Sequence, residues 1–157
     1  MVARNSLLAL APDGTITIYN QFGTVDVIAD LVGYYAPGTG AGFTGTTPTR
    51  VLDTRTGTGI SAGPLGAAAT LTLTVPGLPT GTTAVAMNVT VTNPTAFSWL
   101  TVYPGGSPQP FASNLNYGPT QTIPNMVIVP VGPGNTVTLY NQAGTTDVIA
   151  DLTGYYN

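Results

Sequence analysis

Four of the residue types most used in catalysis are absent from this chain. Its 157 residues include no histidine, cysteine, lysine or glutamate. Without them the chain cannot form a Ser–His triad, a cysteine nucleophile, a lysine Schiff base or an ordinary zinc site. Acid–base chemistry would have to use aspartates alone. We therefore expect a protein that is not an enzyme and has no cofactor or metal, and an aspartate-only hydrolase is the least favoured alternative.

Charge is also scarce. Charged residues make up 6% of the chain, whereas about 25% is typical of soluble domains. Three arginines and a formal net charge of −3 leave no basic patch that could neutralise nucleic-acid phosphates, so nucleic acid is excluded as a partner. No run of about 20 apolar residues is present to form a transmembrane segment. The apolar run at residues 7–11 is too short for the core of a signal peptide, and we expect it to be a strand.

The most prominent feature of the sequence is an internal repeat. Residues 15–35, TITIYNQFGTVDVIADLVGYY, match residues 136–156, TVTLYNQAGTTDVIADLTGYY, at 16 of 21 positions with a constant offset of 121. The match continues backward, with a one-residue slip, between residues 5–12 and 125–132. Such self-similarity indicates a repeat architecture. We call residues 15–35 the N-terminal copy and residues 136–156 the C-terminal copy.

The repeat divides the chain into two parts. Residues 38–157 form a complete repeat unit, and residues 1–37 form a partial repeat that corresponds to the last third of a unit. The segment 36–42, APGTGAG, joins them and has the composition of a flexible linker. We expect the partial repeat to add extra strands, near 6–11, 15–20 and 25–32.

Alternation of apolar and polar residues predicts the fold class. In residues 70–75, Leu71 and Leu73 fall on one face and the threonines on the other. Glycine, proline and asparagine separate such runs, and no long segment has the 3.6-residue apolar period of a helix. We expect eight strands in the complete unit, near 50–54, 70–75, 84–92, 99–103, 113–117, 125–131, 136–141 and 146–153.

Eight short strands in one unit favour an all-β protein, an antiparallel β-sandwich of jelly-roll-like topology. A β-trefoil of similar size is the alternative, although the unit does not divide into three equal parts.

The aspartates are the first candidate site residues. We expect Asp53 and Arg55 to tie a strand end to its loop. Asp147 and Asp151 fall on one side of a strand, as do their counterparts Asp26 and Asp30 in the N-terminal copy. Each pair is about 13 Å apart at the rise of a strand, too far to chelate one ion together. We therefore interpret them as structural residues at strand ends and turns, with a calcium site that uses one aspartate and glycine carbonyls as the alternative.

The aromatic residues are the second candidate. Trp99 and Tyr103, with Phe111 and Tyr117 nearby, lie among segments rich in asparagine, serine and glycine. Aromatic rings with amide groups can bind sugars, so one interpretation of this region is a site that contacts a glycan. Packing in the core or at an interface is the alternative interpretation of Trp99. The residues expected to contact a glycan are Trp99, Tyr103, Asn114 and Asn116.

A series of motifs follows in order along the complete unit: RVLDTR at 50–55, GPL at 63–65, NVTVT at 88–92, LTVYP at 100–104, SNLN at 113–116, DVIAD at 147–151 and GYY at 154–156. This series resembles a tandem-repeat β module of secreted and cell-surface bacterial proteins. Such modules often stand beside cell-wall hydrolase or protease domains. The resemblance implies an extracellular or cell-surface location and an accessory role, and it carries over no catalytic residue.

These observations lead to a functional expectation. An isolated last third would expose strand edges and apolar side chains unless something pairs with it. We expect a non-catalytic structural protein that forms a homo-oligomer or polymer through residues 1–37, by strand pairing into a fibre or surface layer. The alternative is an adhesion module that binds the cell wall or another glycan.

Overall fold

The computed structural model describes residues 10–31, 33–36, 38 and 40–157. In this part of the chain the regular elements are all strands: β1 (Phe43–Asp53), β2 (Ala69–Thr74), β3 (Ala84–Thr92), β4 (Ser98–Pro104), β5 (Leu115–Tyr117), β6 (Ile123–Pro130), β7 (Thr136–Asn141) and β8 (Asp147–Tyr156). The all-β class and the eight strands of the complete unit are confirmed. None of these residues belongs to a helix that could cross a membrane.

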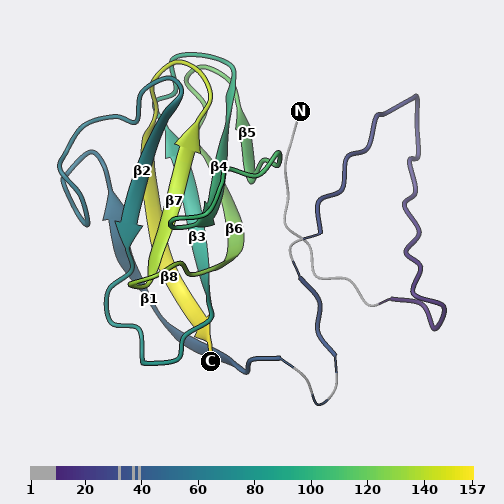
Figure 1. Ribbon diagram of the computed structural model, residues 1–157. Coiled ribbons are helices and arrows are strands. Elements are labelled where there is room, and N and C mark those ends of the chain that lie inside the picture. The colour runs from purple at the N-terminus through teal and green to yellow at the C-terminus, as the bar shows by residue number, and fades with distance from the viewer. Residues whose placement is uncertain (1–9, 32, 37, 39) are drawn as a thin grey trace.

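The strands form two four-stranded antiparallel sheets that pack face to face (Figure 1). The first sheet has the order β1-β8-β3-β6 and the second has the order β2-β7-β4-β5. The hydrogen-bonded neighbours therefore include the pairs β1–β8, β2–β7, β3–β6 and β4–β5. This is an antiparallel ribbon folded over on itself, which is the jelly-roll arrangement. The sandwich is confirmed, and the trefoil alternative is wrong.

The core lies between the two sheets and follows the predicted alternation. Leu71 and Leu73 of β2 point inward, and the threonines between them point to solvent. Strand β7 contributes Val137 and Leu139, both fully buried. Strands β3 and β8 supply the opposite wall with the buried side chains Val85, Met87, Val89, Val91, Val148, Ala150 and Leu152.

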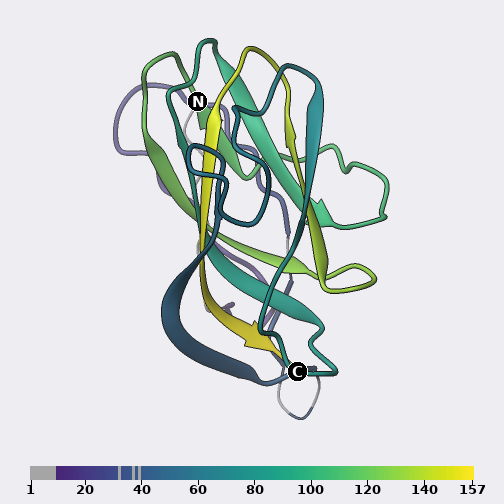
Figure 2. The same ribbon diagram turned by 90° about the vertical axis from the view of Figure 1, so that its left-hand side faces the viewer.

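The two ends of the complete unit meet. Phe43 at the start of β1 pairs with Tyr156 at the end of β8. Just beyond them, the amide of Gly42 donates to the carbonyl of Asn157 at 2.9 Å, and the amide of Asn157 donates back at 3.1 Å. Figure 2 shows the start of β1 (dark blue) beside the end of β8 (yellow), near the C-terminus. Strand β1 begins seven residues before the predicted residue 50, because the pairing with β8 extends through a segment whose sequence does not alternate.

The partial repeat differs from the prediction. Its described residues, 10–31 and 33–36, run as an extended chain outside the sandwich and form no strand (Figure 1). The strands expected near 15–20 and 25–32 are therefore not formed, and the one expected near 6–11 lies almost entirely outside the described residues. The physical reason is pairing. A strand needs a hydrogen-bonded neighbour, and the C-terminal copy already occupies the matching places beside β1, β2, β3 and β4.

Candidate functional site

Asp53 is the centre of an ionic cluster at the end of β1. Its carboxylate is buried and accepts hydrogen bonds from Arg55 Nε at 2.9 Å and Arg55 Nη2 at 2.7 Å. Arg50 Nη1 donates to the same carboxylate at 3.1 Å. The hydrogen bonds and charges of these two arginines hold the pKa of Asp53 well below its usual range. The expected role of Asp53 and Arg55 fits these contacts, which tie the strand end to the following loop.

Asp147 and Asp151 link neighbouring segments to β8. Asp151 accepts from Arg50 Nε at 2.7 Å, which joins β8 to the cluster at Asp53. Asp147 accepts from the hydroxyl of Thr54 and from the side-chain amide of Asn93, each at 3.0 Å. Both carboxylates thus act as hydrogen-bond acceptors within the fold. Across the residues that the structure describes, no three histidine, cysteine, aspartate or glutamate side chains form a group that could hold a metal ion.

An aromatic groove lies on the second sheet, beside β4 and β5. Trp99 and Phe97 are both exposed, and they line a groove of about 410 Å³ together with Asn116 and Gln121. Trp99 and Asn116 are partners in the β4–β5 pairing, so their side chains share the outer face of the sheet. Two rings beside two amide groups could hold a planar sugar face and its hydroxyl groups.

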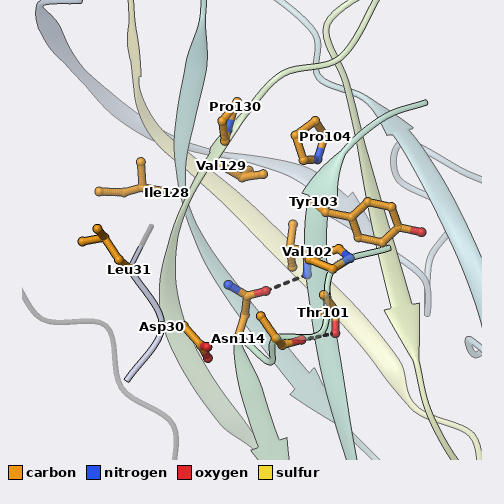
Figure 3. A pocket seen from close by; sticks show the side chains of 12 residues that line it. Asp30, Leu31, Thr101, Val102, Tyr103, Pro104, Asn114, Ile128, Val129 and Pro130 are labelled. Atoms are coloured by element: carbon orange, nitrogen blue, oxygen red, sulfur yellow. Dashed lines mark hydrogen bonds between the residues drawn. The ribbon is translucent and has the colours of Figure 1, made fainter. Parts of the chain in front are cut away.

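The structure divides the four residues expected to contact a glycan between two places. Trp99 and Asn116 lie in the aromatic groove, whereas Tyr103 and Asn114 line a smaller groove of about 190 Å³ between β4 and β6 (Figure 3). Tyr103 is buried, and Asn114 Oδ1 accepts from the amide of Val102 at 2.7 Å. These four residues therefore line two separate grooves.

Sequence reasoning missed Phe97 and Gln121. Phe97 lies in the turn before β4, where no alternation places it on a face, and its ring sits over Gly118, where a Cβ atom would come within 2.8 Å of it. Gln121 Oε1 accepts from the amide of Gly118 at 2.7 Å. Neither contact has a local sequence signal, because both depend on how the two turns meet in space.

Most of the exposed large hydrophobic side chains in the described part of the chain lie on the partial repeat. Val27 is 55% exposed while its counterpart Val148 is fully buried, and Leu31 is 86% exposed while Leu152 is 7% exposed. Eleven of the sixteen exposed large hydrophobic side chains in the described part of the chain belong to this segment: Leu10, Ile16, Ile18, Tyr19, Phe22, Val25, Val27, Ile28, Leu31, Tyr34 and Tyr35. The same sequence pattern thus forms core in one copy and surface in the other.

No family model matches this chain, and no curated protein matches it.

The N-terminal copy already holds one local feature of the folded copy. Asn20 Nδ2 donates to the carbonyl of Gly23 at 2.9 Å, and its counterpart Asn141 donates to the carbonyl of Gly144 at 3.0 Å. Gly23 and Gly144 both have positive φ, 66° and 61°, a conformation that favours glycine. The turn between β7 and β8 is therefore also formed in the copy that lies outside the sandwich.

The end of the N-terminal copy contacts its own counterpart. The hydroxyl groups of Tyr35 and Tyr156 share a hydrogen bond, and their ring centroids are 6.3 Å apart. Burial, together with this bond, raises the pKa of Tyr156 to about 12. Further back, Leu31 and Asp30 border the groove beside β6, near Ile128 and Asn114 (Figure 3).

Proposed function

We propose that this chain is a non-catalytic structural module of the bacterial cell surface that associates with copies of itself through its partial repeat. The observation that carries the proposal is the contrast in burial between the two copies. Large hydrophobic side chains gathered in this number on one exposed segment favour an interaction site, because a soluble protein rarely leaves such a group uncovered. The near absence of charge also supports association, because little like-charge repulsion keeps copies apart.

The open edge of β1 is the surface best suited to receive the partial repeat of another copy. β1 pairs with β8 on one side only, and its residues 43–50 are exposed. Residues 43–47 carry neither charge nor proline, and charged side chains and proline are two usual means of keeping an edge strand from pairing with another chain. Strand addition at this edge would give head-to-tail contacts, which extend into a fibre or sheet unless they close.

The resemblance to repeat modules of secreted bacterial proteins supports the proposed location. The composition supports it as well, since threonine and asparagine are most of the polar residues and lysine is absent. The lack of the usual catalytic side chains supports a structural role over an enzymatic one.

Self-association can be tested with charges placed on the partial repeat. We expect the wild-type chain to form large species as its concentration rises, and the double variant Ile18→Asp/Leu31→Asp to associate about a hundredfold or more weakly. Each apolar side chain contributes about 1.5–3 kcal/mol when it is buried, and an unpaired charge opposes its burial. Sedimentation velocity and negative-stain electron microscopy measure the result.

The control variant is Gln21→Asp/Thr24→Asp, which adds the same two charges to polar positions of the same segment. It should associate like the wild-type chain. A wild-type chain that remains monomeric at every concentration would contradict the proposal.

A second candidate function, glycan binding, is favoured by the aromatic groove. If Trp99 is the platform for a sugar ring, Trp99→Ala should weaken binding to purified cell-wall polysaccharide by about tenfold or more, as is usual for an aromatic residue at the centre of an interface. Titration calorimetry measures the affinity. Phe111→Ala is the matched control, because Phe111 is a fully exposed aromatic residue that does not line this groove. Equal binding by both variants and the wild-type chain, or no binding by any of them, would rule this function out.

A further inference from the structure

The chain has one set of strands, β1 to β6, which we call the framework, and two segments with the sequence of β7 and β8. These segments are the N-terminal copy and the C-terminal copy. The closing position is the space that β8 fills between β1 and β3 and that β7 fills between β2 and β4. In the structure the C-terminal copy occupies this position. We propose that the N-terminal copy is a second closing segment, able to take the closing position of its own chain and release the C-terminal copy.

The first argument is that the N-terminal copy retains residues that have a role only in the closing position. Gly154 must be glycine there, because a Cβ atom would come within 2.5 Å of the Phe43 ring and 2.6 Å of the Thr44 carbonyl. Its counterpart Gly33 has a negative φ, and a Cβ atom there would meet no described atom within 4 Å. Outside the closing position, nothing in its surroundings requires glycine at residue 33.

The second argument comes from a buried amide. Asn141 is fully buried at the end of β7, and its Oδ1 accepts from Ser98 Oγ at 2.8 Å and from the Tyr117 hydroxyl at 2.7 Å. Its Nδ2 also donates to the carbonyls of Leu65 and Gly66. The N-terminal copy has the same asparagine, Asn20, and its turn bond to Gly23 is already made. Insertion would therefore satisfy the framework's polar groups as β7 does.

The third argument is geometrical. Tyr35 is the counterpart of Tyr156, which pairs with Phe43 across the β8–β1 ladder. The seven residues 36–42 separate Tyr35 from Phe43, and they are rich in glycine. With the N-terminal copy in the closing position, these residues would form a hairpin loop between antiparallel neighbours. The contact between Tyr35 and Tyr156 already places this end of the segment beside the closing position.

Two of the five positions at which the copies differ explain why the C-terminal copy is the one seen in place. Thr146 is buried and its hydroxyl donates to the carbonyl of Thr92 at 3.1 Å, whereas the N-terminal copy has Val25. Val137 is fully buried, and the larger Ile16 would replace it. Loss of a buried hydrogen bond and overpacking each disfavour insertion. The N-terminal copy is thus a weaker segment for the same position.

The experiment uses the matched full-length variants Ile18→Asp, Leu139→Asp and the double variant. Leu139 is fully buried in β7, and Ile18 is its counterpart. A carboxylate at residue 139 bars the C-terminal copy from the core. We expect Leu139→Asp to stay folded and monomeric. Relative to the wild-type chain, its amide exchange should be roughly a thousandfold slower at residues 27–31 and faster by a similar factor at residues 147–152. Ile18→Asp should show the amide exchange of the wild-type chain at both sets of residues, and the double variant should be unfolded.

Three results would overturn the inference. The first is that Leu139→Asp is as unfolded as the double variant. The second is that it is folded while residues 27–31 exchange as fast as in the wild-type chain. The third is that it is protected only as a dimer, which would show that the segment comes from a second copy. The inference concerns insertion within one chain, so it does not require the chain to polymerise. Amide exchange of the monomer tests the inference, and the mass of assemblies tests the proposed self-association, so either can fail without the other.

Discussion

Replacing Asp53 with alanine is expected to lower the free energy of unfolding by about 2–4 kcal/mol. The carboxylate is buried and accepts three side-chain hydrogen bonds from Arg50 and Arg55. It also accepts from the backbone amide of Arg55 at 3.1 Å. In the variant these donors have only solvent in place of the carboxylate. Because both guanidinium groups are a little over 40% exposed, water recovers part of the loss, and the expected value lies below that of a fully buried pair.

Urea denaturation of Asp53→Ala beside Asp13→Ala provides the measurement. Asp13 is an exposed turn residue whose hydrogen bonds are local, to Thr15, so Asp13→Ala removes the same charge and should leave the stability close to that of the wild-type chain. An Asp53→Ala chain as stable as Asp13→Ala would show that the cluster contributes nothing.

Acid should reproduce part of this loss. The folded-state pKa of Asp53 lies below its unfolded value, which is about 3.9. The ion pairs therefore stabilise the fold fully above that pH, and the stabilisation is lost as pH falls from about 4 toward the folded-state pKa, with a slope of up to about 1.4 kcal/mol per pH unit. Asp53→Asn should flatten this part of the curve. A curve that is equally steep in the variant would assign the acid sensitivity to other groups.

Replacing Gly59 with alanine is expected to cost about 2–5 kcal/mol, through two independent effects. Gly59 has a φ of 73°, which alanine adopts only with strain. An alanine Cβ would also overlap the carbonyl oxygen of Val51 and come within 3.0 Å of the Leu73 side chain. Val51 and Leu73 are buried on either side of the core, so neither can move away without opening a void elsewhere.

Gly45→Ala in β1 is the matched control. Gly45 has no positive φ, and an added Cβ would meet the Phe43 ring at an ordinary 3.7 Å. Its denaturation midpoint should therefore lie close to that of the wild-type chain. Equal midpoints for Gly59→Ala and Gly45→Ala would mean that the loop after β1 rearranges freely, which its hydrogen bonds to Asp53 argue against.

The sandwich could be predicted because its strands have one face toward the core and one toward solvent. Residues 70–75 and 84–92 show this in their alternation, and the structure buries the apolar set in both. The first half of β1 could not be predicted in this way. Its residues 43–49 are exposed on both faces, so burial imposes no period on them, and only the distant pairing with β8 makes them a strand.

In the partial repeat the sequence predicts strands that the structure does not form. Residues 15–20 have the sequence of a strand, yet the copy at residues 136–141 is the one that forms β7. Local sequence carries the propensity of a strand, but it cannot indicate which of two matching segments is paired. Asn141 illustrates what could have been found. It follows Val137 and Leu139 on the inward face, so a polar residue at that position predicts a buried hydrogen-bonded amide.

The positions of β7 and β8 inside their sheets have a consequence for folding during synthesis. Each is hydrogen-bonded on both sides, so one copy can replace the other only after both sheets have come apart. On the ribosome, the N-terminal copy and the framework through Pro130 are synthesised before residues 131–157, roughly 1–5 s earlier at the usual pace of translation. If the N-terminal copy is a second closing segment, it is therefore made before the C-terminal copy that competes with it for the closing position. The order of synthesis, and not stability alone, would then decide which last third a newly made molecule presents to its neighbours.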